Sequence, residues 1–293
     1  MAEHIGFIGT GIMGGPMALN VRRGGFDLTV WNRTREKTAP HAEAGATVAD
    51  HPADMAALET VILMLTGPEA VESVLFGENG LLTTKDRSLR TLVNMSTVDP
   101  TFTRDLGRRT AERNVLLVDA PVAGTKKPAE DGELVVFAAA PPAAVDAVEP
   151  LLLTMSKKVL RCGDAAGAGS ATKMVFNHLL AAMLTGLAEA LNLGERQGLS
   201  VDFLMDTILA GPLGCGLFQY KSEMMRTGEF PTQFPFKHMT KDIGFARETA
   251  SRVGAATPLA DALAPLYRRG LDQGLGDADF AAIRKVLAGM SEG

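Results

Sequence analysis

Two polar residues with complementary chemistry, Lys173 and Asn177, lie four positions apart in an otherwise apolar segment. In a helix this spacing puts both side chains on one face. A lysine whose pKa is lowered by partial burial can give a proton to a developing alkoxide near neutral pH, and Asn177 could orient the lysine or the oxygen. A solvated lysine beside a buried, backbone-bonded asparagine is the simpler interpretation, and the spacing alone favours it.

A glycine-rich turn follows the first apolar run of the chain and leads into a segment with helical periodicity. It contains Gly9, Gly11 and Gly14, with Ile12 and Met13 between the last two. Gly9 permits a tight turn, Gly11 lets backbone approach a pyrophosphate, and Gly14 allows close packing of helix on strand. An ordinary glycine turn is the alternative, but the strand–turn–helix context predicts a dinucleotide site.

The second strand ends at Trp31 and is followed by Asn32, Arg33 and Thr34, with no acidic residue before Glu36. NAD sites use Asp or Glu here to accept from the ribose 2′-hydroxyl, whereas a 2′-phosphate favours a guanidinium and hydroxyl groups. The segment therefore predicts NADPH or NADP+ as the cofactor. The alternative is that Arg33 is only a solvated residue at a helix start.

The stretch from Ala120 to Gly132 follows an apolar strand that ends at Asp119. In open α/β folds, ligands bind outside the carboxyl ends of the strands. We expect a loop here, in which backbone N–H groups near Ala123, Gly124 and Thr125 could hold a substrate carboxylate. A tight surface loop with solvated lysines is also possible.

Short β-branched runs alternate with helical stretches as far as about Cys162, which predicts a parallel, doubly wound, Rossmann-type sheet in a nucleotide-binding domain of residues 1–165. An antiparallel or edge strand remains possible for the last run, because it lies between Gly132 and Pro141. The predicted strands are Ile5–Gly9, Leu28–Trp31, Thr60–Leu65, Leu92–Met95, Val115–Asp119 and Leu134–Ala139.

From Gly169 onward helical periodicity dominates, which predicts an all-α C-terminal domain of residues 166–293. Its first segment, Ser170–Gln197, contains no proline and should form a long helix that links the domains. Apolar residues surround that helix on nearly every side, so it needs burial on several faces. We expect a second subunit to supply some of it, in a homodimer or homotetramer.

Composition excludes several classes of protein. The 293 residues carry a formal net charge of −5 and no dense basic run, which argues against nucleic-acid binding. The two cysteines are isolated and the five histidines lack ligand spacing, so no metal site is predicted. No signal sequence is evident, and the apolar stretch Met174–Ala188 is short for a bilayer span. We expect a cytoplasmic protein without a membrane partner.

Four segments in order, the glycine turn, the loop after Asp119, the Lys173/Asn177 segment, and Lys241 with Asp242, resemble the β-hydroxyacid dehydrogenase family. This family includes the 3-hydroxyisobutyrate dehydrogenases, and the resemblance covers essentially the whole chain. Residues 32–34 and 126–132 are most similar to the NADPH-dependent glyoxylate/succinic semialdehyde reductase branch. The resemblance implies NADPH-dependent reduction of small aldehyde or keto acids.

The resemblance also implies roles for individual residues. Lys173 would be the proton donor, with Asn177 as the second catalytic residue. The cofactor would contact Gly9, Gly11, Ile12, Met13, Gly14, Asn32, Arg33, Thr34, Met64, Leu65, Thr97 and Lys241. The substrate would contact Ser96, Ala123, Gly124, Thr125, Phe234 and Asp242.

The sequence departs from the family pattern at two places, the substrate loop and the loop before the long helix. Ala123 stands where the family usually has serine, and the lost hydrogen bond to a carboxylate would cost about 1.5–3 kcal/mol of binding unless Thr125 or backbone compensates. Gly163 and Gly167 are separated by three residues, where the family commonly has two. The family resemblance therefore predicts a substrate class and leaves the individual substrate open.

Three alternatives remain. A 3-hydroxyisobutyrate or tartronate semialdehyde type dehydrogenase would fit the same fold, although Arg33 disfavours an NAD enzyme. A non-catalytic dinucleotide-binding protein would be expected to lose Lys173. The related imine reductases lack a lysine at the matching position.

Overall fold

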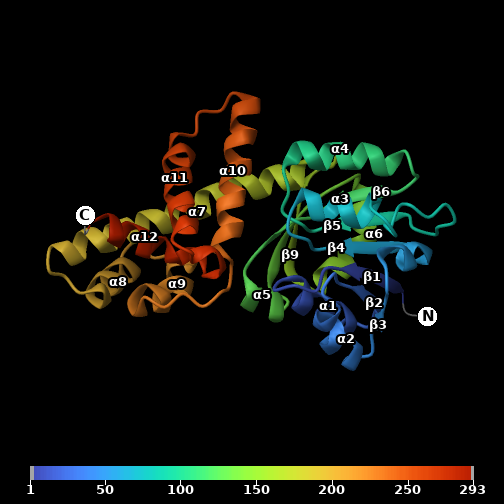
Figure 1. Cartoon of the computed structure of the whole chain (residues 1–293), viewed down its shortest axis with the longest axis horizontal. Coiled ribbons are helices and arrows are strands. Elements are labelled where there is room, and N and C mark those ends of the chain that lie inside the picture. Colours follow the sequence, from blue (N-terminus) through green and yellow to red (C-terminus); the bar gives the residue numbers. More distant parts are fainter. Residues whose placement is uncertain (1–2, 292–293) are drawn as a thin grey trace. The chain divides into compact units, whose positions relative to one another are not determined.

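The computed structural model describes residues 3–291 (Figure 1), and the chain separates into two compact units, Met1–Lys173 and Met174–Gly293. The division between the units falls inside helix α7 (Ala168–Arg196). The domain boundary predicted after residue 165 therefore lies slightly earlier along the chain, and it stays a prediction.

The first unit is built on a nine-stranded sheet with the order β3-β2-β1-β4-β5-β6-β8-β7, and β9 pairs with β8. Neighbours from β3 to β6 are parallel, which confirms the predicted Rossmann-type arrangement. The strands are β1 (His4–Ile8), β2 (Asp27–Trp31), β3 (Thr47–Val48), β4 (Thr60–Leu63), β5 (Thr91–Asn94), β6 (Leu116–Asp119), β7 (Val122–Ala123), β8 (Leu134–Ala139) and β9 (Ser156–Gly163).

Strand β8 runs antiparallel to β6, so the antiparallel possibility for Leu134–Ala139 was the right one. The strands β3, β7 and β9 and the short helix α5 (Lys126–Glu130) were not predicted. Strand β9 escaped notice because most of its residues are exposed and several are basic. The stretch Ala120–Gly132, expected as a loop, contains β7 and the short helix α5 (Lys126–Glu130), in which lysines pair with acids one turn later.

Helices cover both faces of the sheet. Ile62 of β4 belongs to one apolar core, whereas its neighbours Val61 and Leu63 belong to the other. Alternate side chains of a strand point to opposite faces, so the sheet is buried on both. The helices of this unit are α1 (Gly14–Arg23), η1 (Arg35–Thr38), α2 (Ala39–Glu43), η2 (Pro52–Ala57), α3 (Pro68–Phe76), α4 (Pro100–Ala111) and α6 (Pro142–Leu153), besides α5.

The second unit is helical, and within residues 174–291 the only β-type pairing is an isolated bridge between Pro235 and Asp279. This confirms the predicted all-α C-terminal part. After α7 come α8 (Val201–Ala210), α9 (Gly216–Thr227), α10 (Phe236–Val253), α11 (Pro258–Asp272), η3 (Leu275–Asp277), η4 (Phe280–Ala282) and α12 (Ile283–Met290).

Helix α7 has 29 residues, close to the predicted Ser170–Gln197. Within residues 3–291 it is the one helix long and apolar enough to cross a membrane, contrary to the expectation that this segment is too short. The core helix of a soluble protein has the same length and composition, and 44% of the apolar window of α7 is buried.

A buried ion pair holds the second unit together where α9 meets η4. Lys221 is 1% exposed and Asp279 is fully buried, and the Lys221 Nζ lies 2.9 Å from both Asp279 oxygens. The backbone N–H groups of Gln233, Phe234 and Ala281 also donate to Asp279. Burial lowers the pKa of Lys221, and the charge of Asp279 opposes that shift.

Replacing Lys221 with methionine keeps the side-chain length and leaves Asp279 buried without its cation. We expect the free energy of unfolding to fall by about 3–5 kcal/mol, because an uncompensated buried charge remains. Urea denaturation measures it. Lys237→Met, which breaks the exposed pair with Asp277, is the control and should cost less than about 1 kcal/mol. Equal losses in the two variants would contradict this role.

Candidate active site

The glycine turn between β1 and α1 has the backbone that its sequence predicts. Gly9 has a φ of 102°, which favours glycine, and a Cβ on Gly14 would lie 1.8 Å from the Gly9 carbonyl oxygen. An added Cβ on Gly11 would meet nothing within 4 Å. Ile12 is 42% exposed on the same turn, and Met13 is the residue before α1. The open space at Gly11 fits the close approach of a pyrophosphate.

Of the three predicted cofactor residues after β2, one holds the loop together and two are exposed to solvent. Asn32 Oδ1 accepts from the Thr10 N–H at 3.0 Å, and Asn32 Nδ2 donates to the Thr34 carbonyl at 2.8 Å. The asparagine therefore ties the glycine turn to its own loop. Arg33 and Thr34 are exposed. Of the predicted cofactor residues in this loop, Arg33 has the charge and the accessibility to bind a phosphate.

The ends of β4 and β5 are joined by a side chain. The buried Ser96 hydroxyl accepts from the Leu65 N–H at 2.9 Å, and the Ser96 N–H donates to Asn94 Oδ1 at 3.2 Å. Met64, Leu65 and Thr97 are partly exposed. Ser96, predicted to contact substrate, is fully buried, and its oxygen fixes the backbone that carries the predicted cofactor contacts.

The predicted substrate loop begins as a strand. Ala123 of β7 pairs with Val135 of β8 and is 7% exposed, and Gly124 has a φ of 134°. A Cβ on Gly124 would lie 2.5 Å from the Leu134 side chain, so both conformation and space require glycine. Thr125 precedes α5, and among the described residues its buried hydroxyl oxygen has no hydrogen-bond partner.

In the second unit, Asn177 is hydrogen-bonded to the predicted substrate residue Asp242 on α10. Asn177 is 1% exposed, and its Nδ2 donates to Asp242 Oδ2 at 2.6 Å. Lys241 Nζ lies 2.9 Å from the other oxygen of Asp242. An ionised carboxylate can only accept, so it fixes the amide with Nδ2 toward Asp242. Asn177 Oδ1 has no hydrogen-bond partner among residues 3–291.

In the first unit, Lys173 lies in the second turn of α7 and is 6% exposed. Helix α7 runs through both Lys173 and Asn177, and the pairing of their side chains stays a prediction. Near the start of α10, the Phe234 ring contacts His238 and Phe280, with centroid distances of 6.4 and 5.4 Å. The Phe234 N–H donates to buried Asp279, which fixes this predicted substrate residue.

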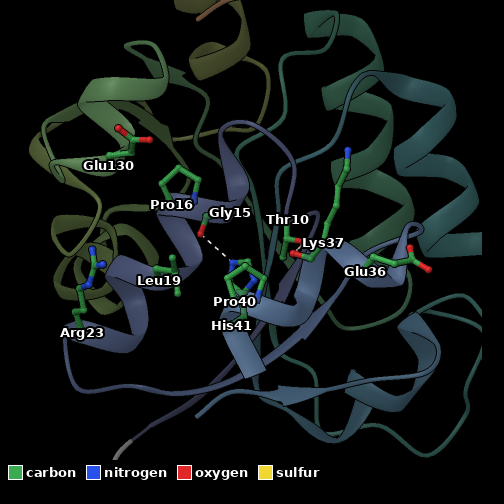
Figure 2. A pocket seen from close by; sticks show the side chains of 10 residues that line it. All are labelled: Thr10, Gly15, Pro16, Leu19, Arg23, Glu36, Lys37, Pro40, His41 and Glu130. Carbon is green, nitrogen blue, oxygen red and sulfur yellow. Dashed lines mark hydrogen bonds between the residues drawn. The ribbon is translucent and has the colours of Figure 1, made fainter. Parts of the chain in front are cut away.

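A cavity of about 530 Å³ lies beside the glycine turn, between α1, η1, α2 and α5 (Figure 2). Thr10 and Gly15 line it, and His41 Nε2 donates to the Gly15 carbonyl at 3.0 Å, shown as the dashed line in Figure 2. None of the predicted catalytic or substrate residues lines this cavity. No cluster of metal-ligating side chains occurs in the part of the chain that the structure describes.

Residues 4–163 match the family described as the NAD binding domain of 6-phosphogluconate dehydrogenase. Residues 167–287 match the family described as the NAD-binding domain of NADP-dependent 3-hydroxyisobutyrate dehydrogenase. The chain belongs to the 3-hydroxyisobutyrate dehydrogenase family. It is an oxidoreductase that acts on CH–OH groups, as the family resemblance implied, and its nicotinamide dinucleotide agrees with the prediction from the glycine turn.

Several members of the 3-hydroxyisobutyrate dehydrogenase family are similar along the whole chain. Glyoxylate/succinic semialdehyde reductase 2 of Arabidopsis thaliana is 35% identical over 97% of this chain and 79% of its own. L-threonate dehydrogenase of Cupriavidus necator is 31% identical over 99% and 98%. The structure of Mycobacterium tuberculosis 3-hydroxyisobutyrate dehydrogenase with L-serine has a TM-score of 0.85 and 28% identity over 98% and 99% of the two chains.

Sequence reasoning missed three buried residues that fix backbone near predicted site residues within their own units. Asp119, at the end of β6, accepts hydrogen bonds from the first turn of α7. Lys221 and Asp279 fix the backbone of Phe234. An acidic residue that ends a buried apolar strand is a signal that could have drawn attention to Asp119, whereas nothing in the sequence separates Lys221 from a surface lysine.

His238 gives the second unit a pH dependence. Burial lowers its pKa, the charges of Lys241 and Lys237 act in the same direction, and Asp242 and Asp277 oppose them. The His238 imidazole therefore binds a proton more readily in the unfolded chain than in the folded one. Its contribution to the stability of the fold is present above the unfolded pKa of about 6.5 and is lost as the pH falls through the lowered folded pKa.

Unfolding at pH 8 and at pH 5 should show a smaller loss of stability in His238→Gln than in the wild type. Both proteins share every other titrating group, so the difference between their pH slopes reports His238. Parallel slopes would refute this assignment.

Proposed function

We propose that this enzyme uses NADPH to reduce small aldehyde or keto acids, such as glyoxylate and succinic semialdehyde, to hydroxy acids, with Lys173 as proton donor and Asn177 beside it. The observation that carries the proposal is the buried Lys173 on the helix that holds Asn177, whose amide is oriented by Asp242. The similarity to the Arabidopsis thaliana reductase supports the substrate class.

Most of the proposed cofactor residues follow the ends of β1, β2, β4 and β5, and Lys241 lies on α10 of the second unit. The open space at Gly11 fits a pyrophosphate, and exposed Arg33 with Thr34 fits a 2′-phosphate. The nicotinamide ring supplies the hydride that goes to the carbonyl carbon. Gly9, Ile12, Met13, Gly14, Asn32, Met64, Leu65, Thr97 and Lys241 complete the proposed set.

The carbonyl oxygen needs a proton during reduction, and Lys173 is proposed to give it. The unpartnered Asn177 Oδ1 can accept one hydrogen bond, either from the lysine ammonium or from the hydroxyl group of the product. Because Asp242 holds the amide nitrogen, the acceptor stays directed away from that carboxylate. Asn177 thus keeps the donor oriented and Lys173 moves the proton.

The carboxylate of the substrate is proposed to lie against Gly124 and Thr125. The buried Thr125 hydroxyl oxygen, without a partner among the described residues, is the group that can replace the serine hydroxyl missing at Ala123. Ser96, Phe234 and Asp242 complete the proposed substrate set. The roles of the two units, residues 1–165 for the cofactor and 166–293 for substrate and assembly, belong to the same proposal.

A second candidate is oxidation of a hydroxy acid by the same site, as in a 3-hydroxyisobutyrate or tartronate semialdehyde type dehydrogenase. The 31% identity to L-threonate dehydrogenase favours keeping it.

Val175, Leu179 and Leu193 on α7 and Phe203 on α8 are 72%, 58%, 63% and 56% exposed. We infer that a second copy of the chain covers these apolar side chains in a cytoplasmic homodimer or homotetramer.

Arg33→Ala tests the cofactor. We expect the ratio of kcat/KM with NADPH to that with NADH to fall about tenfold to a hundredfold, since a charge-assisted bond to the 2′-phosphate is lost. Arg35→Ala is the matched control, because that arginine is also exposed but pairs with Asp50. An unchanged ratio in Arg33→Ala would rule out the assignment of Arg33.

The substrate class and the acid are tested together by following NADPH oxidation with glyoxylate, succinic semialdehyde, tartronate semialdehyde and methylmalonate semialdehyde. We expect turnover with at least one of them, and a loss of about a hundredfold or more in kcat in Lys173→Ala with NADPH binding retained. Lys157→Ala, on the exposed side of β9, is the control.

Lack of turnover with all four would reject the substrate class. Near-normal turnover in Lys173→Ala would reject the lysine as the acid.

A further inference from the structure

The first turn of α7 is held by a carboxylate from a distant strand. Asp119 at the end of β6 is fully buried, and one of its oxygens accepts from the backbone N–H groups of Gly167 and Ser170, each at 2.8 Å. Its other oxygen accepts from the Ser170 hydroxyl, also at 2.8 Å. N–H groups at a helix start lack partners within the helix, and a carboxylate there is favoured by both charge and geometry.

The same turn is packed directly on the strand ends. A Cβ on Gly169 would lie 2.4 Å from the Phe137 carbonyl oxygen and 2.8 Å from that of Asp119. The Ser170 Oγ also lies 2.8 Å from the Thr103 Oγ1 on α4. Strand, α4 and the start of α7 are therefore joined through buried polar groups with no space for the helix to rotate or slide.

Lys173 follows Gly169 by four residues and Ser170 by three, so it lies on the same face one turn later. The position of its Cα is set by the turn that Asp119 holds. We propose that Asp119 is a positioning residue for Lys173, acting through hydrogen bonds that fix the rotation and axial height of α7. This inference rests on the proposed role of Lys173.

The network predicts that asparagine can replace this aspartate. Its Oδ1 would accept the two backbone N–H groups and its Nδ2 would donate to Ser170 Oγ. The Ser170 hydroxyl would then turn to Thr103 Oγ1, while the Thr103 hydroxyl keeps its bond to the Asp99 carbonyl. Each group that bonds Asp119 retains a partner, so Asp119→Asn keeps the three hydrogen bonds to α7 and removes the charge.

The decisive comparison is between Asp119→Ala and Asp119→Asn in the full-length enzyme. We expect kcat to fall about tenfold to a hundredfold in Asp119→Ala, with the NADPH dissociation constant changed less than about twofold, because small displacements of a catalytic group are costly. Asp119→Asn should lose less than about threefold. If Asp119→Ala does not fold, Ser170→Ala removes one of the three bonds and should give an intermediate loss.

Ser156→Ala is the matched control, because it removes a buried serine hydroxyl that donates to the Leu152 carbonyl away from α7. It should leave kcat unchanged. Wild-type kcat in Asp119→Ala and in Ser170→Ala would overturn the proposal. An equal loss in Asp119→Asn and Asp119→Ala would overturn it too, because the charge rather than the hydrogen bonds would then matter.

Hydrogen exchange separates this idea from the proposed function. The amides of Gly167 and Ser170 should exchange faster in Asp119→Ala and at the wild-type rate in Asp119→Asn, whatever Lys173→Ala does to turnover. Unchanged exchange in Asp119→Ala refutes the anchoring even if Lys173 is the acid. Normal turnover in Lys173→Ala with faster exchange in Asp119→Ala refutes only the role of the lysine.

Discussion

The hydrogen bonds between Asp119 and the first turn of α7 connect the helix that carries the proposed catalytic residues to the sheet. The strand fixes where the helix starts, and the helix then carries Lys173 and Asn177 at a fixed spacing. Further along, the same helix supplies Ala181, Leu184 and Leu191 to the core of the second unit. The start of α7 is thus held by hydrogen bonds to Asp119, and its later residues belong to the core of the second unit, so a shift at its start would move both proposed catalytic residues.

Buried polar groups of this kind impose a narrower geometry than apolar packing does. An apolar core tolerates small shifts of a helix, whereas a buried carboxylate with three donors loses a bond when any of them moves. Burial raises the pKa of Asp119, and the donated hydrogen bonds lower it. The backbone N–H groups of Gly167 and Ser170 and the Ser170 hydroxyl all lie within hydrogen-bond distance of this carboxyl group.

The predictable part of the fold and site consists of features whose cause is local. Buried strands are continuous apolar runs, so β1, β2, β4, β5, β6 and β8 were placed from the sequence. The glycine turn was recognised because the strand and the helix that it joins are its neighbours in the chain. Strand β9 was missed because its exposed lysines and arginine resemble a loop. The Asn177–Asp242 bond joins residues 65 positions apart, a separation at which sequence spacing carries no geometric information.

The alanine at position 123, where the family usually has serine, changes which polar groups are left near the proposed substrate loop. A serine hydroxyl at this place would sit in a strand whose side chains are buried, and it would need a substrate or a polar neighbour to satisfy it. Alanine removes that requirement, while two positions on the Thr125 oxygen lacks a partner among the described residues. We therefore expect the proposed substrate carboxylate to bind nearer the turn at Gly124, whose left-handed backbone and close contacts favour glycine. If the proposed reduction of small oxo acids is right, we expect selectivity to depend on how far each carboxylate reaches from its carbonyl carbon, rather than on a hydroxyl group at position 123.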